Sequence, residues 1–210
     1  MEALIQSLID EGDLHSTKII KAFKKIKRGD FLLDEHLQHA AENRAIPISH
    51  GQTNSQPLTV AIMLELLQAR DNDKVLDVGY GSGWQSALLA ELVGTKGKII
   101  AIERIPELCR FGEKNVAKYN YKNVTFVCDD GTKGYKKQAP YDKIIVAAAA
   151  EIGIPDILLT QLKVGGRLVI PVGKYEQEMV VVDKIAKDEY KEKRIPGFQF
   201  VPLVPKKWGE

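Results

Sequence analysis

Cysteine is scarce in this chain, with only Cys109 and Cys128 among its 210 residues. The two lie in separate predicted elements and show neither metal-ligand spacing nor a disulfide framework, so we expect buried, reduced thiols and no metal site. Long apolar runs are missing as well, because no stretch approaches the ~20 apolar residues that span a bilayer. The first residues lack the basic start and apolar run of a signal peptide. These absences predict a cytoplasmic protein with no membrane partner.

A surplus of one charge is also missing, because 30 lysines and arginines stand against 28 aspartates and glutamates. The formal net charge of +2 gives no strong attraction for nucleic acid. Basic residues crowd positions 18–28, which we interpret as the solvated face of a helix, with a nucleic-acid surface as the alternative. The 44% hydrophobic content is ordinary for a globular protein, and the length predicts one domain over residues 1–210. No heptad pattern indicates a partner copy, so we expect a monomer.

What the chain does contain is an alternation of short apolar strands and helices, which is typical of a parallel sheet covered on both faces. The fold class predicted is therefore α/β, doubly wound and mostly parallel. An antiparallel pair, residues 178–186 and 198–204, is expected to finish the sheet, with the charged stretch 187–194 as its hairpin connection. The other predicted strands are residues 75–78, 98–103, 124–128, 144–150 and 167–171, and the predicted helices are 3–9, 16–26, 58–69, 87–93, 106–119 and 155–162.

The chain is predicted to divide into three segments of one domain. Residues 1–57 form an N-terminal helical extension and a loop, 58–173 the core, and 174–210 the C-terminal strands. Between Gly29 and Pro57 the periodicity fails, and a long polar loop within a compact domain usually has a function. A surface connector is the alternative. Ser55 or Thr53 is expected to help cap the helix that follows.

The stretch from Lys74 to Trp84 predicts a buried strand that turns through a glycine loop into a helix. Glycines permit positive φ and close approach of a ligand, and a helix N-terminus directs backbone N–H groups at one point. A dinucleotide fingerprint would need glycine where Trp84 stands, and no phosphate-binding Gly-Lys-Ser/Thr is present. The pattern found instead is Asp77-x-Gly79-x-Gly81-x-Gly83.

Acidic residues follow the next two strands. Glu103 ends one strand 20 residues after Gly83, where a carboxylate can hydrogen-bond both hydroxyls of a ribose. Asp130 follows the next strand, within reach of an adenine amino group, although it can equally be a turn residue before Gly131. The three strand ends together predict a site for an adenosyl group with a short polar tail.

These features resemble the S-adenosylmethionine-dependent methyltransferases, and more narrowly the protein-L-isoaspartate O-methyltransferase family. The resemblance runs from about Arg28 to Leu203 and includes Gly51-Gln-Thr-Asn-Ser-Gln-Pro57, Asp130-Gly-Thr, and residues 161–173 and 198–203. It implies a Rossmann-like methyltransferase sheet and S-adenosyl-L-methionine as cofactor. The implied reaction is repair: methylation of the α-carboxylate of L-isoaspartyl residues in damaged proteins and peptides, after which the ester collapses to a succinimide.

The resemblance also implies roles for individual residues. Ser55 is the active-site hydroxyl, on a loop that closes over cofactor and substrate, and residues 198–203 help line the groove for a substrate peptide. His50 is not needed as a base, because a carboxylate is already ionised at pH 7. The residues expected to bind the cofactor are Thr53, Asn54, Gly79, Tyr80, Gly81, Ser82, Gly83, Glu103, Arg104, Asp130 and Gly131.

The match departs from the family pattern at four positions. The family usually has an aliphatic residue at Asn54, a small Thr or Ser at Tyr80, Tyr at Trp84 and Gly at Asp129. Asn54 and Tyr80 are predicted to lie where the methyl acceptor approaches, so they bear on substrate identity. Two alternatives stay open: a methyltransferase acting on another carboxylate or a small molecule, and a non-catalytic module that binds S-adenosylmethionine.

Overall fold

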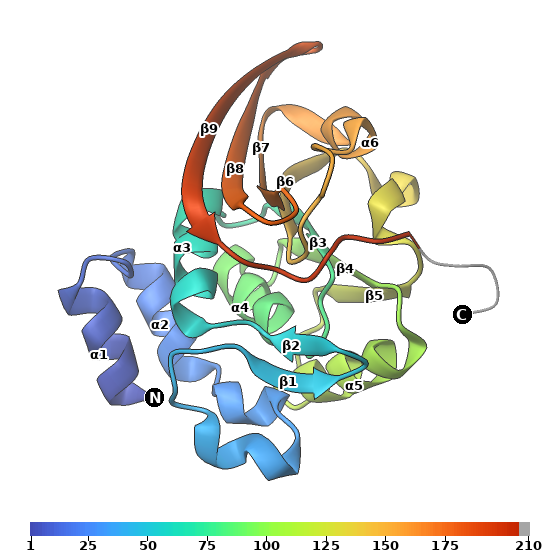
Figure 1. The fold of residues 1–210 in the computed structure, drawn as a ribbon. Coiled ribbons are helices and arrows are strands. Elements are labelled where there is room, and N and C mark those ends of the chain that lie inside the picture. The colour runs from blue at the N-terminus through green and yellow to red at the C-terminus, as the bar shows by residue number, and fades with distance from the viewer. Residues whose placement is uncertain (206–210) are drawn as a thin grey trace.

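The computed structural model describes residues 1–205; residues 206–210, the end of the predicted domain, lie outside the described residues. Its centre is one seven-stranded sheet (Figure 1). The first five strands in its spatial order are parallel, and the last two are antiparallel to their neighbours, which confirms the predicted mostly parallel α/β fold. The order is β5 (Val124–Cys128), β4 (Lys98–Glu103), β3 (Lys74–Val78), β6 (Tyr141–Val146), β7 (Leu162–Val172), β8 (Gln177–Ala186) and β9 (Glu189–Phe198).

Strand residues alternate between two apolar cores, as the two-residue period of a strand requires. Val75 packs into one core and its neighbour Leu76 into the other. The first core lies beneath α1 (Glu2–Asp10), α2 (Thr17–Lys25), α3 (Pro57–Leu67), α4 (Trp84–Val93) and α5 (Pro106–Ala117). The second lies beneath α6 (Asp156–Thr160) and the segment with the short 3-10 turns η3 (Gly131–Lys133) and η4 (Lys136–Gln138). Within residues 1–205, no helix has both the length and the apolar character needed to cross a membrane.

The C-terminal strands differ from the prediction. The charged stretch 187–194 is not a connection, because β9 begins at Glu189 and pairs along β8. Charged side chains suit this edge strand, since they discourage pairing with other chains. Residues 199–205 instead run back across the ends of the central strands (Figure 1). There the Ala149 N–H donates to the Val201 carbonyl at 2.8 Å and the Leu203 N–H donates to the Ala149 carbonyl at 2.7 Å.

The segment predicted to be an irregular loop is more ordered than expected. It contains η1 (Arg28–Phe31), η2 (Asp34–His39) and a hairpin of β1 (Ile46–Ser49) and β2 (Gln52–Asn54). Ile48 of the hairpin packs on Ile105 and Leu108 at the start of α5. The predicted cap of α3 is wrong: the Leu58 N–H donates to the Asn43 side chain at 3.1 Å, and neither Thr53 nor Ser55 caps the helix.

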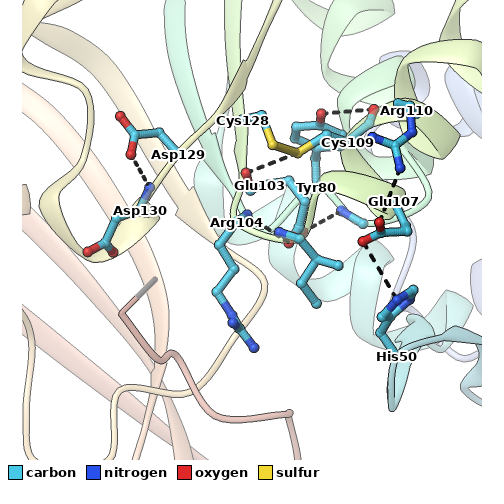
Figure 2. The surroundings of a disulfide bond; sticks show 12 residues. His50, Tyr80, Glu103, Arg104, Glu107, Cys109, Arg110, Cys128, Asp129 and Asp130 are labelled. Atoms are coloured by element: carbon cyan, nitrogen blue, oxygen red, sulfur yellow. Dashed lines mark hydrogen bonds and ion pairs between the residues drawn. A yellow bond between two sulfur atoms is a disulfide. The ribbon is translucent and has the colours of Figure 1, made fainter. Parts of the chain in front are cut away.

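The expectation of two reduced thiols is also wrong, because Cys109 and Cys128 form a disulfide with a Cα–Cα distance of 5.8 Å. Cys109 lies in the first turns of α5 and Cys128 ends β5 (Figure 2). The helix that connects two parallel strands folds back along the sheet, which brings its beginning beside the end of the later strand. The pair is 19 residues apart in sequence, so local patterns gave no indication of this contact.

Candidate active site

A cleft that is partly open to solvent lies at the carboxyl ends of the central strands. The strand order changes direction between β3 and β6, and ligands of open α/β sheets bind at such switch points. The hairpin, the loop after β3, the end of β4, the segment after β6 and the C-terminal segment all contribute walls. Its lining includes residues 52–55, 78–82, 102–105, 147–148 and 201–204.

The cleft brings together most of the predicted site residues: all except Gly83 and Asp130 line it. Gly83 lies below the loop with a φ of +85°, and a Cβ atom there would be 2.7 Å from the Gly112 carbonyl oxygen. The absence of a side chain at Gly83 therefore allows the loop to pack closely on α5. Asp130 is buried beside the cleft, where it caps η3.

Glu103 is fixed at the end of β4 by backbone donors from two directions. One carboxylate oxygen accepts the Gly81 N–H at 3.1 Å, and the other accepts the N–H groups of Arg104 at 2.8 Å and Ile105 at 3.0 Å (Figure 2). The residue is 7% exposed and lines the cleft. Because each carboxylate oxygen has two lone pairs, the oxygen that accepts only the Gly81 N–H keeps capacity for a further donor such as a ribose hydroxyl.

The glycine loop presents bare backbone to the cleft. Gly79 and Gly81 have φ of +80° and +47°, in the region where glycine is favoured. A Cβ atom on Gly79 would meet nothing closer than 3.9 Å, so a ligand can approach the backbone there. Under the loop, Asp77 accepts hydrogen bonds from Gln85 at 2.7 Å and from the Ser86 hydroxyl at 2.5 Å.

Asp77 makes folding stability pH-dependent. Burial raises its pKa to about 6, against the opposing hydrogen bonds from Ser86 and Gln85. Since the folded-state pKa lies above the unfolded one, the stabilising contribution is present at low pH and is lost as the pH rises through 6. Relative to Asp77→Asn, the wild type is expected to gain about 1 kcal/mol of unfolding free energy between pH 7 and pH 5. Urea unfolding of both proteins checks this, and a difference that does not change with pH contradicts it.

Asp130 is held as a carboxylate. Burial opposes ionisation, but hydrogen bonds from Thr132 and the charge of Lys133 bring its pKa below the usual value. One oxygen accepts the Thr132 N–H at 3.0 Å and hydroxyl at 2.6 Å, and the other lies 3.3 Å from the Lys133 ammonium. Asp129 accepts the Asp130 N–H at 2.8 Å and so steadies the turn.

Asn54 and Tyr80, which are predicted to lie where the methyl acceptor approaches, line the cleft, and their side chains are 2% and 3% exposed. The Tyr80 hydroxyl donates to the Cys109 carbonyl at 3.1 Å (Figure 2). Its ring packs edge-on against Phe126. The Asn54 amide bonds to Arg28 and Ser82. Both side chains are engaged in the protein interior.

Sequence reasoning missed Arg28, which was assigned to a solvated basic face. Its side chain is fully buried and donates to the carbonyl oxygens of Glu42 at 2.8 Å, Arg44 at 2.7 Å and Ser55 at 2.9 Å. Its guanidinium also lies 5.4 Å from the Trp84 ring centroid. None of these partners is local in sequence, so no pattern around Arg28 signals its burial.

The strand order, the glycine loop and the acidic residues at the carboxyl edge define a Rossmann-like methyltransferase. The solved structure of a Plasmodium falciparum protein in complex with S-adenosyl-L-homocysteine has this fold, with a TM-score of 0.85 and 22% identity over 96% of this chain and 97% of that one. The chain belongs to the protein-L-isoaspartate(D-aspartate) O-methyltransferase family, whose model matches residues 1–208.

Relatives of known family are similar over nearly the full length. The protein-L-isoaspartate O-methyltransferase of Methanothrix thermoacetophila is 44% identical over 205 residues, covering 98% of this chain and 95% of the relative. That of Thermococcus onnurineus is 46% identical over 203 residues, covering 95% and 91%. A solved protein-L-isoaspartate O-methyltransferase has a TM-score of 0.88 and 29% identity, covering 98% of this chain and 66% of its own.

Proposed function

We propose that this protein transfers a methyl group from S-adenosyl-L-methionine to the α-carboxylate of L-isoaspartyl residues in damaged proteins. One observation carries the proposal: Ser55 and the groups suited to an adenosyl ligand line the same cleft, in a chain of this family. The ester that forms collapses to a succinimide, which gives the damaged chain a route back to a normal aspartyl linkage.

The residues present fit the cofactor. Glu103 is available to the ribose hydroxyls, and the apolar side chains of Val78, Ile102 and Ile105 line the same cleft. We assign the backbone of Gly79 and Gly81 to the polar tail of the ligand. The remaining proposed contacts are Thr53, Asn54, Tyr80, Ser82, Gly83, Arg104, Asp130 and Gly131, with Gly83 and Asp130 acting from outside the cleft lining.

The reaction requires the protein to align the attacking carboxylate with the methyl group and the sulfur. When bound, S-adenosylmethionine supplies a methyl group on a positively charged sulfur, and the S–C bond breaks as the new O–C bond forms. The attacking carboxylate is already ionised at neutral pH, so no general base is needed. Alignment of the reacting groups can lower the barrier by up to ~7–11 kcal/mol. We assign Ser55, assisted by Thr53, to orient the carboxylate by hydrogen bonding.

The C-terminal segment is the proposed support for the substrate chain. Residues 201–204 line the cleft in an extended conformation, with Val201 and Leu203 bonded to Ala149. Backbone groups of an extended segment alternate in direction, so the Pro202 carbonyl points away from Ala149. An extended peptide can use such a segment for main-chain hydrogen bonds.

We further propose that residues 1–210 work as one domain, as a monomer in the cytoplasm, on polypeptides rather than on nucleic acid or membranes. The net charge of +2, which gives no strong attraction for nucleic acid or membranes, supports polypeptides as the partners. Light scattering should then give the mass of one chain, 23.4 kDa.

The function is tested with radiolabelled cofactor and two peptides that differ only in one isoaspartyl or aspartyl linkage. Labelling of the isoaspartyl peptide alone is expected. Equal labelling of both peptides would point to another acceptor, and binding of the cofactor with no labelling of any protein would point to a non-catalytic module.

Glu103→Gln is expected to weaken cofactor binding by about tenfold, because a neutral amide forms weaker hydrogen bonds than a carboxylate and has one acceptor oxygen in place of two. Calorimetry with S-adenosyl-L-homocysteine measures the change. Glu107→Gln is the matched control, since Glu107 is exposed on α5 and pairs with Arg110 at 3.1 Å. Equal affinities for the two variants would mean that Glu103 does not contact the ligand.

A further inference from the structure

Asn54 directly precedes the proposed active-site serine, and its buried side chain forms hydrogen bonds in the protein interior. It is the last residue of β2. Its amide oxygen accepts a hydrogen bond from Arg28 Nε at 2.8 Å, and its amide nitrogen donates to Ser82 Oγ at 3.0 Å. One buried side chain therefore joins the segment that carries Ser55 to the glycine loop.

Arg28 anchors one end of this connection. Its guanidinium donates to the Ser55 carbonyl at 2.9 Å as well as to the Asn54 side chain. It also holds the carbonyl oxygens of Glu42 and Arg44, so it is fixed by several segments at once. Because one rigid, planar group binds both the Asn54 amide and the Ser55 carbonyl, it fixes the position of the Asn54 side chain relative to the Ser55 backbone.

Ser82 forms the other end, within a loop that is itself held from two more sides. The Ser82 carbonyl accepts a hydrogen bond from the Asn115 side chain of α5 at 3.1 Å. Its neighbour Gly81 donates to Glu103 at 3.1 Å. The loop is thereby tied to α5, to β4 and, through Asn54, to the hairpin.

We propose that Asn54 is a positioning residue for methyl transfer, which holds Ser55 at a fixed place relative to the cofactor loop. The inference rests on the proposed function, in which Ser55 orients the methyl acceptor. The aliphatic residue usual in the family could fill the same space, but in this chain it would leave Arg28 Nε and Ser82 Oγ, which both pair with the Asn54 amide, without this partner. Buried polar groups seldom stay unpaired, so the Ser55 segment would move towards other partners.

Asn54→Leu is expected to lower kcat with the isoaspartyl peptide by about 10- to 100-fold, because a misplacement of about 1 Å can cost this much. Affinity for S-adenosyl-L-homocysteine should change far less, since Glu103 and the glycine backbone remain. Asn54→Asp should restore most of kcat: one carboxylate oxygen accepts from Arg28 and the other from the Ser82 hydroxyl. A purely structural role would not give this rescue together with a loss confined to kcat.

Asn123→Leu is the matched control, because Asn123 also donates from a partly buried amide, to the carbonyl oxygens of Ala90 at 3.2 Å and Gly94 at 2.9 Å. It precedes β5 at the end of the sheet opposite the cleft. Its substitution should reduce stability and leave kcat unchanged.

The possible outcomes distinguish a failure of the proposed function from a failure of the role inferred for Asn54. A wild-type protein that does not methylate the isoaspartyl peptide overturns the proposed function, and this inference with it. An active wild type beside an Asn54→Leu variant with undiminished kcat overturns the inference alone. If Asn54→Leu does not fold, Ser82→Ala removes the same contact with a smaller change, and an undiminished kcat in that variant overturns the inference equally.

Discussion

Arg28→Met is expected to lower the free energy of unfolding by about 3–5 kcal/mol, because it leaves several buried carbonyl groups without a donor. The guanidinium is fully buried and serves the carbonyl oxygens of Glu42, Arg44 and Ser55. Burial, with the nearby charge of Arg44, lowers the pKa of Arg28 to about 10, so the group stays protonated at neutral pH. A methionine fills part of the space and supplies none of these hydrogen bonds.

Urea unfolding of Arg28→Met beside Arg44→Met measures this effect. Arg44 is exposed and pairs with Glu42 on the surface, so its loss should cost less than about 1 kcal/mol. Equal destabilisation by the two variants would contradict the role assigned to Arg28 as the buried centre of the N-terminal segment.

Removing the Cys109–Cys128 disulfide is expected to lower the free energy of unfolding by about 3 kcal/mol, the chain-entropy cost for a loop of this length. For a chain of this size that corresponds to a fall in Tm of about 6–12 °C. Loss of the disulfide should also loosen the glycine loop, because the Tyr80 hydroxyl of that loop donates a hydrogen bond to the Cys109 carbonyl.

Thermal unfolding of the wild type with and without a thiol reductant measures the effect, and Cys128→Ser supplies the control. The variant should match the reduced wild type and should not respond to the reductant. A wild type whose Tm is the same in both states would contradict the stabilising role of the disulfide.

Much of the fold could be predicted from sequence because its determinants are local. The apolar run of β4 gives the bounds Lys98–Glu103 directly, and the same strand ends at Glu103 in the structure. Glycines at 79, 81 and 83 mark a turn that glycine alone tolerates well. Since the carboxyl ends of parallel strands meet at one edge, the glycine loop and Glu103 could be brought together without coordinates.

The features that were missed depend on contacts between distant segments. Strand β9 is highly charged, and only its pairing with β8 makes it a strand. The disulfide depends on the path of α5 over the sheet, and the burial of Arg28 depends on carbonyl groups in two other segments, residues 40–44 and 54–55. Asn54 is interpreted from the sequence as a departure from the family pattern, and only the fold reveals the partners of its side chain.

The most direct test of the central claim is to locate the transferred methyl group. The protein is incubated with S-adenosyl-L-methionine and an isoaspartyl peptide, and the product is fragmented in a mass spectrometer before the ester collapses. The account predicts one methyl group, on the α-carboxylate of the isoaspartyl residue, followed by a succinimide at the same residue. A methyl group on any other atom, or on the aspartyl form of the peptide at the same rate, would contradict it.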